Sequence, residues 1–323
     1  GLVVASLLCR EIIRVLPKAN FRLMVASAYG GFLLFHGGFS ASIPLIVATK
    51  GNFSEEFIGR LIPIQETLFS PLNLFLCGTL VVLIPLTVWY ISKVEKASLQ
   101  TYTLQPEPIY EPEAKSHAPA ERLEHSRLIC LLAGGTGLTY LFIKICSGAF
   151  SLELSYVCFV LLFLAIFLHR NIKSLLRAVD EAAQKVGPII LQFPFYASIT
   201  GILKQSGLAS IMATYFAKIS TPATFDLISF YTAGLLTLFV PSGGGLWVIE
   251  APIVIEAAKT LGSDLPKACM AVAWGDAWTH MIQPFWALPV LAIAGLKLRD
   301  IMGYCVILLI VSGIVITTGF LIF

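Results

Sequence analysis

The sequence predicts an all-α, polytopic membrane protein with two loosely similar halves, each interrupted by a glycine-rich break. Hydrophobic residues make up 57% of the chain and charged residues only 13%, whereas about a quarter of an ordinary soluble domain is charged. The mean hydropathy is +0.84, so a soluble core that could bury this apolar surface is implausible. Glycine-rich breaks at 37–44 and 241–247 interrupt charge-free apolar stretches, one in each half. Such interrupted helices build the binding sites of secondary transporters.

Residues 1–93 are predicted to form the first membrane repeat. The chain starts with Gly rather than Met and is apolar at 2–16, so we expect it to begin inside a membrane segment of a longer protein. Residues 23–49 contain no Lys, Arg, Asp or Glu, but glycines and a proline interrupt them. We interpret this stretch as a span followed by a re-entrant hairpin. Residues 72–92 are an apolar 21-mer, long enough to cross a bilayer as a helix.

Residues 94–126 differ from the rest of the chain because they are rich in Glu, Pro and Lys and lack apolar periodicity. This composition predicts a solvated, flexible linker between two membrane halves. We interpret its two histidines, His117 and His125, as surface residues. The sequence therefore places no function in the linker.

Residues 127–323 are predicted to form the second membrane repeat. It begins with two apolar runs near 128–149 and 154–168. Residues 172–186 place apolar side chains on one helical face and charged ones on the other, which predicts a helix at the membrane interface. Further apolar segments follow at 188–203, 207–219, 227–249, 277–296 and 301–323.

The break in the second half is the most informative motif of the chain. Residues 227–249 carry no charge and are long enough to span a bilayer. Pro241 and three consecutive glycines nevertheless disfavour a continuous helix. The alternative to a binding site is a glycine-rich kink that only serves helix packing.

The two halves show a loose internal similarity. Each combines a Gly/Ser break with a later apolar helix that contains a threonine and is interrupted by proline. The threonines are Thr67 and Thr279, which follow Pro44 by 23 positions and Pro252 by 27 positions. Corresponding interrupted segments in two halves point to a transporter site near the membrane midplane.

A helix that begins inside the membrane presents free backbone amides, which attract anions together with the helix dipole. The amides after the second break and the serine hydroxyls of both breaks therefore predict a carboxylate site. Polar side chains of the second Thr-containing helix would complete it. The candidate substrate-binding residues are Ser40, Ser42, Ser242, Gly243, Gly244, Gly245, Thr279 and Gln283.

Asp276 lies in an apolar stretch between aromatic and small residues. A carboxylate there is costly unless it is paired, protonated or in contact with water. It is the first candidate for ion coupling, against the alternative of a structural hydrogen bond. His36, at the mouth of the first break, is a candidate proton relay, and Thr67 is a candidate cation ligand. Glu250 is interpreted as a cap of the helix that follows the break.

Several classes of function have no support in the sequence. The chain contains no nucleophile elbow, zinc-binding HExxH, Walker A or dinucleotide-binding motif in context, so an enzyme is not expected. We expect no cofactor and no metal site. The ion that drives transport would be Na⁺ or H⁺. The net charge of +3 on 323 residues gives no nucleic-acid footprint.

The chain resembles the bacterial short-chain fatty acid transporter family (AtoE type) of the ion transporter superfamily. The matching passages include the segments 36–44, 239–245, 271–278, 283–289 and 300–304. The resemblance implies uptake of short-chain monocarboxylates such as acetoacetate or butyrate through the bacterial inner membrane. It also implies the plan of the superfamily, with inverted repeats and two re-entrant hairpins, and further N-terminal membrane segments. His280 departs from this pattern, which leads us to expect Asn there.

The resemblance and the residues together predict a multi-pass secondary transporter of short carboxylates, driven by a proton or sodium gradient. Its partners would be the substrate and the lipid bilayer, and a homodimer is one assembly that this interpretation allows. Two alternatives stay open. One is a transporter of another organic anion, such as a dicarboxylate, and the other is a membrane sensor that binds the same ligands without transporting them.

Overall fold

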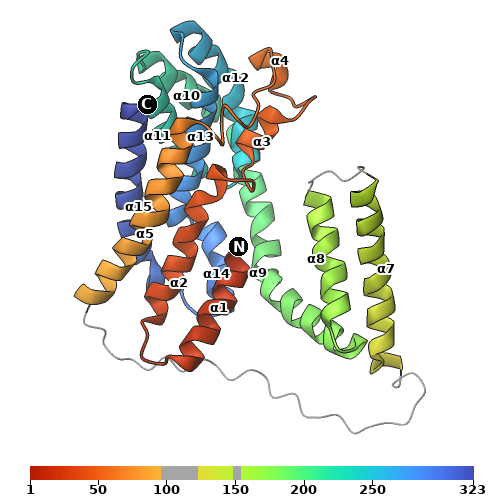
Figure 1. Ribbon diagram of the computed structural model, residues 1–323. Coiled ribbons are helices and arrows are strands. Elements are labelled where there is room, and N and C mark those ends of the chain that lie inside the picture. Colours follow the sequence, from red (N-terminus) through yellow and green to blue (C-terminus); the bar gives the residue numbers. More distant parts are fainter. Residues whose placement is uncertain (96–122, 148–153) are drawn as a thin grey trace. The chain divides into compact units, whose positions relative to one another are not determined.

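A computed structural model describes residues 1–95, 123–147 and 154–323 (Figure 1). In these residues all regular structure is helical, so the predicted all-α class is confirmed. The chain groups into two compact units, one of residues 1–105 and 188–323 and one of residues 106–187. Most of the predicted linker lies outside the described residues. The inverted repeats, the re-entrant hairpins and the domain boundaries stay predictions.

The first unit contains most of the helices that the following paragraphs discuss. They are α1 (Leu2–Val15), α2 (Phe21–Gly30), the 3₁₀ helix η1 (Gly31–Gly37), α3 (Ile43–Ala48), α4 (Glu55–Ile58), α5 (Pro71–Val94), α10 (Leu208–Ile219), α11 (Phe225–Thr237), α12 (Gly243–Leu261), α13 (Leu265–Thr279), the 3₁₀ helix η2 (His280–Ile282), α14 (Pro284–Ala294) and α15 (Leu298–Ile322). The second unit contains α7 (Arg127–Cys146) and α8 (Leu154–Leu168).

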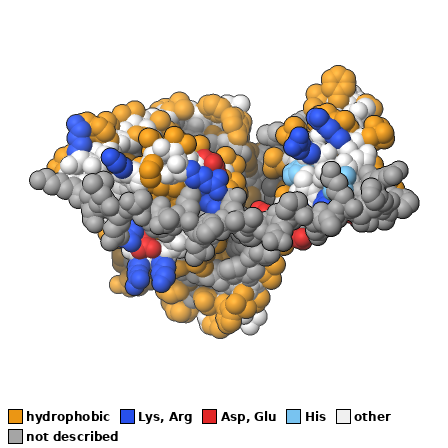
Figure 2. Space-filling model, turned by 90° about the horizontal axis from the view of Figure 1, so that it is seen from below, with side chains coloured by type: hydrophobic (Ala, Val, Ile, Leu, Met, Phe, Trp, Pro, Cys, Tyr) orange, Lys and Arg blue, Asp and Glu red, His pale blue; other side chains and the backbone are white. Residues whose placement is uncertain are grey.

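Within the described residues, three helices are long and apolar enough to cross a membrane, namely α5, α7 and α15. The helix predicted at 72–92 corresponds to α5. Many large hydrophobic side chains on these helices are solvent-exposed, and Figure 2 shows hydrophobic side chains on the visible surface. A soluble protein rarely exposes large contiguous apolar patches, so the exposed apolar side chains agree with a bilayer environment.

The structure contains the helix predicted at 172–186 and extends it. These residues form the first part of α9 (Ile172–Gln205), which continues past them. Pro188 and Pro194 lie inside it and do not end it. Proline removes one intrahelical hydrogen bond and often kinks a helix without terminating it. The chain leaves α9 near Gly207, whose φ of +71° lies in the left-handed region.

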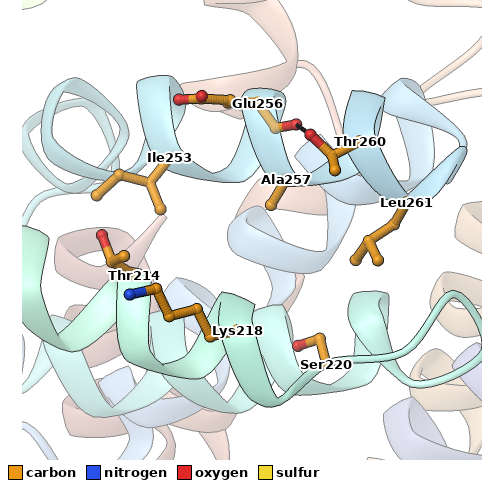
Figure 3. A pocket seen from close by; sticks show the side chains of 8 residues that line it. All are labelled: Thr214, Lys218, Ser220, Ile253, Glu256, Ala257, Thr260 and Leu261. Carbon is orange, nitrogen blue, oxygen red and sulfur yellow. Dashed lines mark hydrogen bonds between the residues drawn. The ribbon is translucent and has the colours of Figure 1, made fainter.

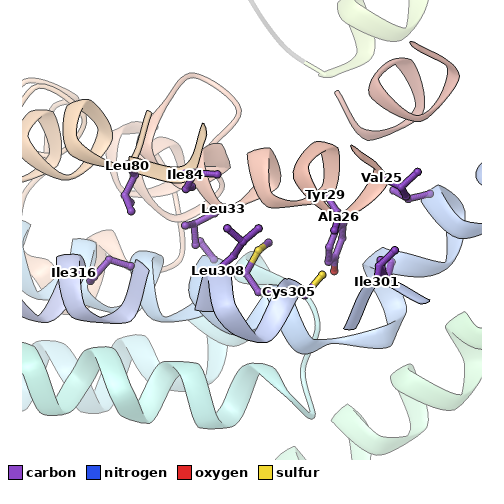
Figure 4. Packing of buried hydrophobic residues seen from close by; sticks show 14 of the residues in the cluster. Val25, Ala26, Tyr29, Leu33, Leu80, Ile84, Ile301, Cys305, Leu308 and Ile316 are labelled. Atoms are coloured by element: carbon purple, nitrogen blue, oxygen red, sulfur yellow. The ribbon is translucent and has the colours of Figure 1, made fainter. Parts of the chain in front are cut away.

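The core of the first unit lies where α2, η1, α5 and α15 pack together. Figure 4 shows the buried side chains of these helices interleaved, with Tyr29 of α2 beside Cys305 of α15. The hydroxyl of Tyr29 donates a hydrogen bond to the carbonyl of His280, 2.5 Å away. The core therefore connects the first half of the chain directly to the segment after α13.

Helices α11 and α13 approach each other at Gly275. A Cβ atom added to Gly275 would overlap the backbone carbonyl oxygen of Phe230 and lie 2.8 Å from the Cβ atom of Ala233. Glycine lets two helix backbones come this close, as in many membrane helix pairs. This contact matters for the site because α13 carries Asp276 and α11 ends at Thr237.

We expect Gly275→Ala to destabilise the protein, because the added methyl group has to push α11 away from α13. Overpacking of this kind costs about 1–3 kcal/mol, and the thermal unfolding of purified protein in detergent would measure it. Gly303→Ala is the control, because a Cβ there meets no atom within 4 Å and alanine favours the helix. Equal midpoints for the two variants would contradict the expected close contact.

Candidate functional site

Each glycine-rich break contains a short non-helical segment, residues 38–42 in the first and residues 238–242 in the second, while Gly243, Gly244 and Gly245 already form the first turn of α12. The first break separates η1 from α3, and the second separates α11 from α12. Ser242 is the N-cap of α12 and accepts a hydrogen bond from the amide of Gly245 at 3.3 Å. This cap fixes the point where α12 begins, because it satisfies one of the free amides of the first turn.

The two breaks lie against each other at Gly243. A Cβ atom added there would lie 2.5 Å from Ser42 Oγ, 2.6 Å from His36 Nε2 and 2.8 Å from Asp276 Oδ2. Gly243 therefore fills a space enclosed by η1, the start of α3 and α13, and only glycine fits. The two breaks therefore contact each other in the structure.

Asp276 is the centre of a buried polar network next to this contact, and its side chain is 0% exposed. Its Oδ2 atom lies 2.8 Å from His36 Nε2, and its Oδ1 atom accepts a hydrogen bond of 2.9 Å from Thr237. The Nε2 atom of His280 lies 3.7 Å from Oδ1. The carboxylate therefore has the partners that an ionisable group needs in apolar surroundings.

The imidazoles of this network keep unused nitrogen atoms. Within the described residues, Nδ1 of His36 and both ring nitrogens of His280 have no hydrogen-bond partner. Ser42 Oγ lies 3.5 Å from Nε2 of His36. The rings of Phe35 and Trp286 lie 5.5 and 5.9 Å from that of His280. The site thus combines free polar atoms with an aromatic wall, as binding sites for small amphiphilic ligands do.

Asn73, on α5, holds the first break in place. Its amide group donates to the carbonyl of Gly37 at 3.0 Å and to that of Leu68 at 2.7 Å. Its Oδ1 atom accepts a bond of 3.1 Å from the indole of Trp274 on α13. These three bonds tie the first break to the helix that carries Asp276.

The remaining predicted residues differ in their relation to this network. Ser40 is exposed and donates to the carbonyl of Phe35 at 3.0 Å. Gln283 is buried and donates to the carbonyl of Thr237 at 2.8 Å, while its Oε1 atom has no partner among the described residues. Thr279 donates to the carbonyl of Gly275 within its own helix, at 3.4 Å. Thr67 is buried with its hydroxyl unpartnered in the described chain, and no bond joins it to Asp276.

The structure adds Thr237 to the site and corrects the interpretation of Glu250. Thr237 is the last residue of α11, and nothing in its sequence surroundings distinguishes it from other membrane threonines. The interpretation of Glu250 as a helix cap is wrong, because α12 begins at Gly243 and is capped by Ser242. Glu250 is buried two turns inside the helix.

Glu66 and Glu256 lie outside this network. Arg60 bonds to Glu66 at 2.6 Å, and this hydrogen bond lowers the pKa of the Glu66 carboxyl below its usual value. Lys259, three residues after Glu256 on α12, donates to the carbonyl of Phe57 at 2.6 Å. Within the described residues, no group of three or more His, Cys, Asp or Glu side chains converges as a metal site would.

A separate groove of about 480 Å³ runs between α10 and α12. Figure 3 shows Lys218 of α10 on one wall and Glu256 of α12 on the other, with Thr260 donating to the carbonyl of Glu256 at 2.9 Å. Its residues are Thr214, Lys218, Ser220, Ile253, Glu256, Ala257, Thr260 and Leu261. The groove does not include the residues around Asp276.

Comparison with known proteins identifies the family. Residues 1–323 match the model of the family described as "Short chain fatty acid transporter". The chain is 40% identical over 326 residues to a protein of Escherichia coli (strain K12) named "Putative short-chain fatty acid transporter", with 100% of this chain and 74% of that protein covered. A protein of the same name from Haemophilus influenzae is 36% identical over 328 residues, covering 99% of this chain and 73% of that protein. No solved structure matches the chain.

These matches agree with the apolar helices and with the buried polar network at the meeting point of the breaks. They also agree with the expectation that the protein is not an enzyme, since the family is one of transporters. The protein is thus an all-α membrane protein and belongs to the short-chain fatty acid transporter family.

Proposed function

We propose that this protein is a multi-pass secondary active transporter of the bacterial inner membrane that imports short-chain monocarboxylates such as acetoacetate or butyrate. The observation that carries the proposal is the buried contact of Asp276 with His36 and Thr237 at the point where the two breaks meet. A buried, ionisable network at the junction of two interrupted helices is the arrangement used to couple ion and substrate binding.

The substrate carboxylate binds at the start of α12 in this proposal. The first turn of a helix presents unsatisfied amides and the positive end of its dipole. Asp276 lies next to Gly243, on one side of the start of α12. Ser242 is exposed, and Gly244 and Gly245 are half-buried, so the other side of the start of α12 is accessible to an anion. The segments next to it carry Ser42, Thr279 and Gln283.

Ion coupling is assigned to Asp276 and His36, with a proton or Na⁺ as the driving ion. The groups bonded to Asp276 are an imidazole and a hydroxyl, and an imidazole changes its charge near neutral pH. Thr67 is a more distant candidate, supported by its buried hydroxyl. A homodimer is the oligomeric state we propose to test first.

The proposal predicts that the reconstituted full-length protein accumulates labelled butyrate when a proton or sodium gradient is imposed. Proteoliposomes with each gradient in turn, and a panel of acetate, acetoacetate, butyrate and succinate, identify the ion and the substrate class. Preference for succinate would favour the dicarboxylate alternative. Binding without accumulation under either gradient would favour the sensor and contradict transport.

A further inference from the structure

Glu250 is a buried carboxyl group that the network around Asp276 does not use. Its side chain is 1% exposed. Neither of its oxygen atoms has a hydrogen-bond partner among the residues that the structure describes. An ionised carboxylate without hydrogen bonds in an apolar interior costs several kcal/mol. The neutral acid avoids most of this cost, so the surroundings suit a carboxyl group that holds a proton.

The side chains next to Glu250 are apolar. Ile249 and Ala251 flank it in the chain, and Trp247 and Val254 lie about one turn away along α12. All four belong to the buried hydrophobic cluster that α12 shares with α13. These neighbours offer little to an ionised carboxylate, because aliphatic groups cannot replace the hydrogen bonds it makes in water.

Glu250 lies on the face of α12 that carries the proposed transport site. Glu250 follows Gly243 by seven residues, which is about two turns, or roughly 10 Å along the axis, and returns to the same face of α12. That face contacts Asp276, His36 and Ser42 at Gly243. Side chains in a helix lean toward its N-terminus, so the side chain of Glu250 leans along α12 in the direction of this contact. The charge of Asp276 acts electrostatically on Glu250.

Among the ionisable groups on the helices packed against α12, Asp276 is the one whose charge acts on Glu250. Lys267 of α13 is paired with Asp226 of α11 at 3.0 Å. Lys218 of α10 lines the separate groove with Glu256, and α3 consists of aliphatic residues and proline. Other titratable side chains on the packed helices are Cys269 on α13, Tyr231 on α11, Tyr215 on α10, and Glu55 and Glu56 on α4.

We propose that Glu250 carries the proton that this transporter moves together with its carboxylate substrate. The inference rests on the proposed function and names the coupling ion. It places the proton on Glu250 and gives Asp276, which His36 holds in place, the part of favouring that proton through its negative charge. The Glu250 carboxylate takes up a proton from one side of the membrane, forming an O–H bond, and releases the same proton on the other side. No covalent bond to the substrate forms or breaks.

Electrostatics links the two binding events. A substrate carboxylate at the start of α12 adds negative charge near Asp276 and Glu250, and this charge favours the protonated form of Glu250. By thermodynamic reciprocity, a proton on Glu250 strengthens substrate binding by the same factor. Proton and substrate therefore bind together, as symport requires.

The contacts favour a proton over Na⁺ as the coupled ion. A sodium ion, like other hard cations, needs several oxygen ligands around it. Both oxygens of Asp276 are already bonded, to His36 and to Thr237. Glu250 adds two oxygens, but its immediate neighbours are apolar. A proton needs only one carboxylate oxygen.

The first experiment uses the full-length protein in proteoliposomes and compares wild type, Glu250→Gln and Glu256→Gln. Glutamine mimics the protonated acid in shape but cannot release a proton. We expect Glu250→Gln to lose proton-driven butyrate accumulation by about tenfold or more, within the range of typical coupling energies, while butyrate exchange continues. Glu256, exposed on the same helix, is the control and should keep both. Full proton-driven accumulation by Glu250→Gln would overturn the inference.

The second experiment does not depend on transport. Infrared spectroscopy of the purified protein at neutral pH detects the C=O stretch of a protonated carboxylic acid. We expect one such band in wild type and in Glu256→Gln, and its loss in Glu250→Gln. If that band is the same in all three proteins, Glu250 is ionised and the inference fails. If the band behaves as expected but wild type moves no carboxylate, the proposed function fails while the protonation of Glu250 stands.

Discussion

Replacing Gly243 by alanine is expected to abolish carboxylate uptake. The added Cβ atom would lie 2.5 Å from Ser42 Oγ, 2.6 Å from His36 Nε2 and 2.8 Å from Asp276 Oδ2. Contacts this short force the start of α12 away from the other break and open the polar network. Because catalysis and transport depend on placement within about 1 Å, we expect a loss of uptake of roughly a hundredfold, measured in proteoliposomes.

The neighbouring position provides a graded comparison. A Cβ atom added to Gly244 would meet only Ile46 Cδ1, at 3.7 Å, which is an ordinary contact. Gly244→Ala should therefore fold with an undisturbed network, and any loss of uptake would report on contact with the substrate. If Gly243→Ala transports as well as the wild type, the two breaks do not meet in the working protein.

Asp276→Asn is expected to abolish gradient-driven accumulation and to leave substrate exchange partly intact. Asparagine keeps the shape of Asp276 and its hydrogen bonds to His36 and Thr237 but removes the negative charge. Without this charge, Asp276 no longer adds to the substrate's negative charge in favouring a proton on Glu250, so coupling is lost before binding is. Accumulation and exchange are measured on the same purified variant.

Asp264→Asn is the matched control for this experiment. Asp264 is the N-cap of the same helix, is exposed, and makes no side-chain capping bond, so its replacement changes the charge by the same amount away from the network. It should keep normal accumulation. If Asp276→Asn shows the same ion dependence as wild type in both assays, Asp276 has only a structural role.

Those parts of the fold that depend on contiguous residues were predictable. The apolar run at 72–92 became α5 because an uncharged segment of that length satisfies its backbone only as a helix. The two breaks were also predictable, because glycine and proline weaken helices wherever they occur together. Asp276 was recognisable because an ionisable group in an apolar stretch needs a partner.

What was not predictable depends on distant packing. His36 and Asp276 are 240 residues apart, and no local pattern says that they touch. Thr237 became a partner of Asp276 only because α11 ends there. The position of Glu250 depended on where α12 begins. The continuity of α9 through two prolines was not predictable either, because a proline inside a helix can kink it or end it.

The partners of Asp276 bear on the electrical character of transport. They are an imidazole and a hydroxyl, so neither supplies the permanent positive charge of a lysine or arginine to neutralise an arriving anion. In the proposed mechanism each monocarboxylate crosses with one proton, and the pair is electrically neutral. A membrane potential of 100 mV changes the free energy of transport by about 2.3 kcal/mol for each net charge moved. The neutral pair of substrate and proton moves no net charge, so the potential does not drive it. The pH difference and the substrate gradient, rather than the voltage, then set how far accumulation proceeds.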